Sequence, residues 1–105
     1  MTLDPTAVQV LDELPAEVVL QTVPVLVRLR SDAPDERAAV AEVTARLEPV
    51  RGLYDEVLVE RQEDDGSFFV LGRFVTVSVD VHTAVMGVAE TLADAGVPVD
   101  EVWAS

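Results

Sequence analysis

The sequence contains no cysteine and no lysine, and its basic residues are few. Without cysteine the chain can form no disulfide, no thiolate zinc site and no cysteine nucleophile. Seven arginines stand against 20 acidic residues, giving a net charge of −13. This charge disfavours nucleic acid and anionic membranes as partners, because both bind basic surfaces. No apolar run approaches the roughly 18 residues of a membrane-spanning helix, and no basic-plus-apolar leader opens the chain. We therefore expect a cytoplasmic protein.

Asparagine and isoleucine are absent too, whereas valine occurs 22 times and alanine 12 times. This usage, with arginine as the one basic residue type, is typical of a high-GC bacterial genome. Hydrophobic residues make up 50% of 105 residues and the mean hydropathy is +0.29. These values predict a folded chain with one domain, which we place at residues 23–105.

Residues 1–22 precede the first secure strand and are predicted to form an N-terminal extension that packs on the domain. Asp4-Pro5 resembles a helix start, and apolar residues then recur at helical spacing up to Leu14. A strand is predicted from Pro24 or Val25 to Arg30, since a proline has no N–H to give to a central strand. Its odd-numbered residues should lie on one face and Leu26, Arg28 and Arg30 on the other.

Two helices are predicted from capping residues and apolar spacing. Ser31-Asp32-Ala33-Pro34-Asp35-Glu36 combines acids and a proline, as helix starts do, and an apolar stripe follows as Val40, Val43, Leu47 and Val50. The second helix begins near His82 or Thr83 and ends at Gly96, a left-handed cap on which Val97 folds back.

The remaining segments are predicted to be strands. Residues 54–62 and 67–81 flank Asp65-Gly66, a strong hairpin signal, and Gly72 marks a bulge or bend. Residues 99–104 form the last strand. The order β-α-β-β-α-β predicts an α+β, ferredoxin-like sandwich: one antiparallel sheet with both helices on one face and strands one and three in its centre.

Such a fold leaves one sheet face without helices, and this open face is predicted to be apolar. The expected residues are Leu26, Leu58, Phe68, Val70 and Phe74. A patch of this kind is unusual on a monomer. We expect a homodimer in which two open faces pair; the alternative is a cover formed by residues 3–22.

The chain is poor in catalytic groups, and we predict no catalytic residue, cofactor or metal. His82 is the one histidine; with Asp80 it could form an acid–base pair, or Asp80 could cap the second helix and leave His82 exposed. The acid-rich stretch 55–65 lacks the spacing of a calcium loop and is read as a solvated hairpin.

Arginine supplies the candidate ligand site. Arg28 and Arg30, with Asp32, are predicted to lie near the edge of a small-molecule site at the sheet face or the dimer interface, because arginine offers a two-pronged donor to a carboxylate or phosphate. Tyr54 and Arg73 are further candidates. Internal ion pairs with the acid-rich hairpin would explain these arginines equally well.

The turn Arg30-Ser31-Asp32-Ala33-Pro34-Asp35, followed by Ala39-Val40-Ala41-Glu42-Val43, resembles the Asp-x-Pro-Gly turn of ACT-type regulatory domains. The resemblance implies a ferredoxin-like fold, paired domains and an amino-acid ligand near that turn. Asp35 stands where that family has a glycine beside the ligand, and its carboxylate would repel an amino acid's carboxylate. The element order also resembles the dimeric α+β barrels, which include cofactor-free enzymes.

From these observations we predict a non-enzymatic, acidic, homodimeric domain for ligand sensing or protein interaction, with a basic protein or a small molecule as partner. The alternative is a cofactor-free enzyme of the dimeric α+β barrel type with a cavity on the sheet face.

Overall fold

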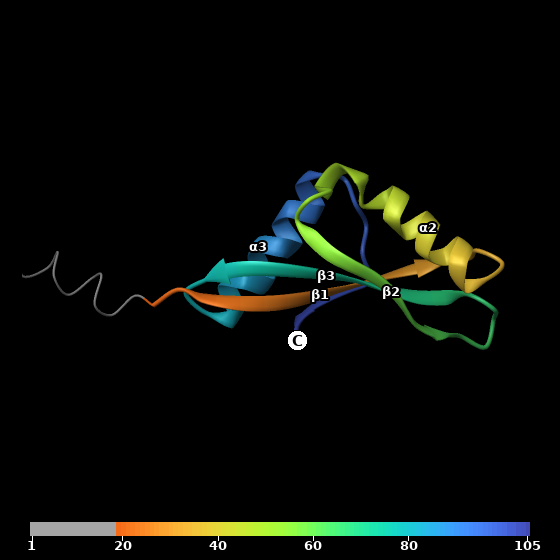
Figure 1. Cartoon of the computed structure of the whole chain (residues 1–105), viewed down its shortest axis with the longest axis horizontal. Coiled ribbons are helices and arrows are strands. Elements are labelled where there is room, and N and C mark those ends of the chain that lie inside the picture. Colours follow the sequence, from red (N-terminus) through yellow and green to blue (C-terminus); the bar gives the residue numbers. More distant parts are fainter. Residues whose placement is uncertain (1–18) are drawn as a thin grey trace, which may run out of the picture.

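The computed structural model describes residues 19–105, which form an open four-stranded antiparallel sheet and two helices (Figure 1). The strands stand in the order β2-β3-β1-β4. The predicted α+β arrangement, with the first and third strands in the centre, is confirmed. The elements are β1 (Gln21–Ser31), α2 (Glu36–Arg46), the short 3₁₀ helix η1 (Glu48–Val50), β2 (Tyr54–Gln62), β3 (Phe68–Ser78), α3 (Val81–Asp94) and β4 (Glu101–Ala104).

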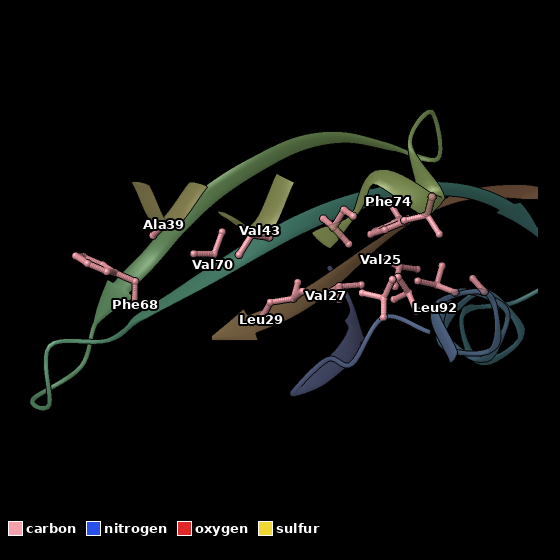
Figure 2. Close-up of a cluster of buried hydrophobic side chains, with 14 of the residues drawn as sticks. Val25, Val27, Leu29, Ala39, Val43, Phe68, Val70, Phe74 and Leu92 are labelled. Carbon is pink, nitrogen blue, oxygen red and sulfur yellow. The ribbon is translucent and has the colours of Figure 1, made fainter. Parts of the chain in front are cut away.

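The core lies between the sheet and the two helices, which share one face (Figure 2). Odd-numbered residues of β1 and even-numbered residues of β3 supply the sheet side of this core. Ala39 and Val43 cover it from α2, and Ala84, Val88 and Leu92 cover it from α3. The fully buried sheet residues include Val25, Val27, Leu29 and Val70.

The strand β1 begins earlier than predicted, because Pro24 is accommodated inside it. Pro24 lies opposite Val75 of β3, and its carbonyl accepts a hydrogen bond from Ser105 N at 3.0 Å, just beyond β4. The proline's backbone groups thus point to the β4 side, where the ladder is ending. No hydrogen bond to β3 is lost, so a proline is tolerated here.

The predicted composition of the open face is wrong for three residues of β3. Phe68, Val70 and Phe74 are 3%, 0% and 2% exposed and belong to the core. Leu26 and Leu58 do lie on the open face, which also carries the odd-numbered residues of β3. The bulge predicted at Gly72 is absent, because Gly72 pairs regularly with Val27 of β1. The irregular pairings lie in β2, between Tyr54 and Glu56 and between Val59 and Arg61.

Gly72 instead allows a close approach of the helix layer to the sheet. A Cβ at this position would meet Leu47 Cδ1 at 3.2 Å and Phe74 Cε1 at 3.5 Å. The missing side chain therefore makes room for Leu47, which is fully buried at the end of α2. A glycine inside a strand is explained here by packing and not by a bend.

Both helices are capped by an aspartate. Asp35 Oδ1 accepts from Ala38 N at 2.8 Å, and Asp80 Oδ1 accepts from Thr83 N at 2.7 Å. The first helix starts later than the sequence suggested, so Pro34 precedes the cap. At the end of α3, Gly96 has φ +74° and Val97 is 6% exposed, as predicted.

The hairpin turn is confirmed, with a positive φ at Gly66 and not at Asp65. Gly66 N donates to Glu63 O at 3.0 Å, and Glu63 N donates to Ser67 O at 2.7 Å. The helix predicted from Pro5 to Leu14, and the packing of the extension on the domain, lie outside the described residues.

Candidate functional site

The centre of the open face is occupied by Arg28, which is held between acidic and aromatic side chains. Its Nε and Nη2 donate to the two carboxylate oxygens of Glu60 at 2.8 and 2.9 Å, and its Nη1 donates to Glu101 at 3.1 Å. The guanidinium lies 4.7 Å from the ring centre of Trp103 and 5.4 Å from that of Phe69. These five residues, here called the Arg28 cluster, join β1, β2, β3 and β4.

The arrangement shifts the pKa values of the paired groups. Hydrogen bonds from Arg28 hold the pKa of the Glu60 carboxyl below its usual range, although partial burial opposes this. The same hydrogen bonds raise the pKa of Arg28. Both groups are therefore kept charged, and the donors that a ligand carboxylate would use already have partners.

Arg30 occupies the hairpin end of the same face. Its Nε donates to Ser67 Oγ at 3.0 Å, and it forms an ion pair with Asp65. Ser67 in turn donates to Asp65 through its backbone N and its hydroxyl, which lowers the pKa of the Asp65 carboxyl. Arg30 and Arg61 also stack on Phe69, 5.9 and 4.8 Å from its ring centre.

The other predicted ligand residues are dispersed. Asp32 lies in the exposed loop between β1 and α2. Tyr54 packs on the core residue Phe74, with ring centres 5.8 Å apart. Arg73 is paired with Asp55 at 2.9 Å. The ligand site predicted from Arg28, Arg30 and Asp32 stays a prediction, and the contacts match the alternative in which these arginines form internal ion pairs.

His82 lies in the exposed first turn of α3, two residues after the capping Asp80. The hydrogen bonds from Thr83 lower the pKa of the Asp80 carboxyl, and the neighbouring His82 contributes to the same shift. The carboxylate is thus occupied by the helix terminus.

A second surface stands out by its lack of charge. Nine large apolar side chains are exposed in the described residues, and eight of them gather around the start of β1, the end of β3 and the first half of α3. We call these eight residues the apolar end: Val19, Leu20, Leu53, Val75, Val77, Val79, Val81 and Met86. The segments 19–27 and 74–89 that carry all of them except Leu53 hold only two titratable side chains, Asp80 and His82. In Figure 1 this end of the molecule lies opposite the acid-rich hairpin.

The apolar end also contains an incomplete part of the sheet. The pairing of β2 with β3 ends at Tyr54 and Phe74, so among residues 19–105 Val75–Ser78 are paired with β1 alone. Beside this free edge lies a cavity of about 310 Å³ between β3, Leu53 and α3. Ser78 lines the cavity, and its buried Oγ has no hydrogen-bond partner among the described residues.

Sequence reasoning missed the Arg28 cluster as a unit and the apolar end. Trp103 faces Leu26 across β1 and β4, a register that the short last strand does not reveal. The sequence did contain a signal for the apolar end, because the uncharged run from Phe74 to Val79 is followed by a nearly uncharged first half of α3.

Residues 19–105 contain no group of three or more metal-ligating side chains. No helix in this part of the chain is long and apolar enough to cross a membrane. No protein-family model matches the sequence, and neither the curated proteins nor the solved structures yield a match.

Proposed function

We propose that the chain is a non-enzymatic protein-interaction domain that docks through its apolar end. The observation that carries this proposal is the concentration at that end of eight of the nine large apolar side chains that are exposed in the described part of the chain. Water-exposed valines and leucines gathered in this way are costly for an isolated protein and are typical of a docking surface.

The distribution of charge supports the same function. Arg28 and Arg30 on the open face are engaged with Glu60, Glu101 and Asp65, whereas the segments of the apolar end hold almost no charge to desolvate. Docking at this end therefore buries apolar area with little penalty for polar groups. The net charge of −13 would favour a partner that carries basic residues, in a salt-dependent way.

Ligand sensing is the second candidate, because the cavity of about 310 Å³ beside Leu53 is lined mostly by apolar and small side chains. Its volume is at the lower end of ligand pockets, and it lacks the converging charged groups that fix a polar ligand. A small apolar molecule retained by the purified protein in native mass spectrometry would favour this function over protein interaction.

The experiment places a photo-crosslinking residue at Met86, in the apolar end, and in a separate variant at Arg37, on an exposed position of α2. Adducts formed in the cells that make the protein are identified by mass, and each candidate partner is then purified. We expect a specific adduct from Met86 alone, and we expect Val77→Glu to weaken binding of that purified partner at least tenfold. Leu58→Glu, which changes an exposed leucine outside the apolar end, is the matched control. Equal adducts from both positions, or binding that Val77→Glu leaves unchanged, would contradict the proposal.

A further inference from the structure

The free edge of β3 raises the question of which chain segment completes it. In an antiparallel sheet, successive residues direct their N–H and C=O groups to alternate sides. Pro24 O and Arg28 O accept bonds from the β4 side, so the odd-numbered residues of β1 bond to the even-numbered residues of β3. The backbone groups of Val77 therefore point away from β1, into the side that β2 does not reach.

We propose that a second copy of this chain pairs with the free edge, so that β3 of one copy runs antiparallel to β3 of the other about a two-fold axis beside Val77. This inference rests on the proposed function and names the partner of the apolar end. An antiparallel pair of identical strands satisfies two-fold symmetry, because the same residues are donor and acceptor in both copies. The two sheets then become one continuous sheet.

The register follows from the space that β2 occupies. A pairing centred on Thr76 would place Ser78 of the partner copy opposite Phe74, a position that Tyr54 already holds. A pairing centred on Val77 sets each Val77 opposite its counterpart and Val75 opposite Val79 of the partner copy. It stops there because the next residue, Asp80, is the cap of α3, so Tyr54 stays in place beside Phe74. In this register Thr76 lies opposite Ser78 of the partner copy, and neighbouring Thr and Ser hydroxyls on one sheet face form hydrogen bonds. The buried Ser78 Oγ, which has no partner among residues 19–105, would then have one.

Charge favours a second copy over the chain's own first residues. Two molecules that each carry a net charge of −13 repel one another, and they can meet most easily where that charge is absent. The run Phe74–Val79 is uncharged, and so is the run 19–27, of which residues 21–25 pair with residues 74–78. Residues 1–18 hold four acidic residues and no basic one, so their placement on the apolar end would bring charge onto it.

The composition of the edge agrees with a paired strand. Free strand edges of soluble proteins are commonly protected by a lysine, another charge or a proline. The free part of β3 has none of these, and Val77 is 66% exposed. An uncharged edge rich in β-branched residues is what pairing between copies requires.

The test uses the full-length chain in sedimentation velocity from about 1 to about 300 µM, with Val77→Glu as the variant and Leu58→Glu as its matched control. We expect the wild type and Leu58→Glu to shift from monomer to dimer over this range. Val77→Glu adds a negative charge to both sides of the interface and should weaken the dimer at least tenfold. A Val77→Glu dimer as tight as the wild type, or a wild type that stays monomeric, overturns the inference.

Amide hydrogen exchange of Val77 distinguishes the remaining occupants. We expect its protection to increase with protein concentration in parallel with dimer formation. Protection that is the same at all concentrations in a monomer would assign the edge to residues 1–18, and a dimer with an unprotected Val77 would use another interface; either result overturns the inference. If the chain is monomeric but Val77→Glu still abolishes binding of a different captured protein, self-pairing fails while the proposed function stands. If Val77→Glu changes neither dimer formation nor binding of another protein, both the self-pairing and the proposed function are wrong.

Discussion

Replacement of Arg28 by alanine is expected to destabilise the fold by about 1.5–3 kcal/mol. The change removes a two-pronged, charge-assisted hydrogen bond to Glu60, worth roughly 1–2 kcal/mol at a partly exposed site. It also removes the contacts with Trp103 and Phe69, at about 0.5–1 kcal/mol for stacking of this kind. The side chains of Arg28 and Glu60 are 17% and 24% exposed, so water screens the pair only in part.

Urea unfolding followed by circular dichroism measures this effect as a lower midpoint at an unchanged slope. Arg37→Ala is the control, because it removes the same charge from an exposed position on α2 and corrects for the general repulsion in an acidic chain. Arg28→Lys keeps the positive charge but cannot donate two parallel hydrogen bonds to Glu60, so its loss of stability should be about half that of Arg28→Ala. A loss below about 0.5 kcal/mol for Arg28→Ala, after this correction, would refute the reasoning and return Arg28 to the candidates for ligand binding.

Three further predictions concern the charged groups and the packing of the sheet. Arg28 lowers the pKa of Glu60 in the folded state, so the stability from this pair is complete above the ordinary glutamate pKa of about 4.3 and is lost as the pH falls through the lower folded value. The stability of Glu60→Gln should therefore depend less on pH between about 5 and 3 than that of the wild type. An unchanged pH dependence in urea unfolding would contradict this. Asp35→Ala should lower stability by about 1 kcal/mol through loss of the α2 cap, whereas Asp32→Ala should leave thermal unfolding nearly unchanged. Gly72→Val should destabilise by about 1–3 kcal/mol because its side chain meets Leu47, and if Leu47→Ala in the same chain does not reduce that penalty, the contact is not its cause.

The order of elements could be predicted because local signals agreed with the global fold. Capping aspartates, Gly66 and Gly96 each stand at a place where the backbone needs that residue type. The faces of β1 could also be assigned, since Arg28 and Arg30 alternate with valine and leucine and mark the side away from the core. A strand with polar residues on one face reveals which face is buried.

The faces of β3 could not be assigned in the same way. Phe68, Phe69, Val70 and Leu71 are all apolar, so alternation gives no preferred face. A bulge at Gly72 would also reverse the faces of the residues on one side of it. The answer depends on the pairing with β1 and on the place of the bulges in β2, neither of which is local. The prediction for Phe68, Val70 and Phe74 failed for this reason.

The candidate sites show the same limit at longer range. Arginine on the open face was predicted, but the carboxylates that engage Arg28 come from positions 60 and 101, on both sheet edges. Opposite charges far apart in the sequence cannot be matched before the strand order is known. The apolar end likewise depends on the difference in length between neighbouring strands. At this end of the sheet, β3 continues beyond its last pairing with β2, and β1 continues beyond its last pairing with β4.

This mismatch in strand length links the two surfaces. Where all four strands are present, the open face is covered by the ion pairs and aromatic rings around Arg28. The charged groups there pair with one another, so few hydrogen-bond donors are left for a ligand. Where only β1 and β3 remain, the described residues form no such pairs, and Val75 and Val77 are exposed beside the free edge of β3. A chain with 20 acidic residues could have carried one of them on this edge at little cost to the fold, and an acid there would have blocked pairing. Their absence from residues 74–79 is the strongest reason to seek the function of this protein at its apolar end.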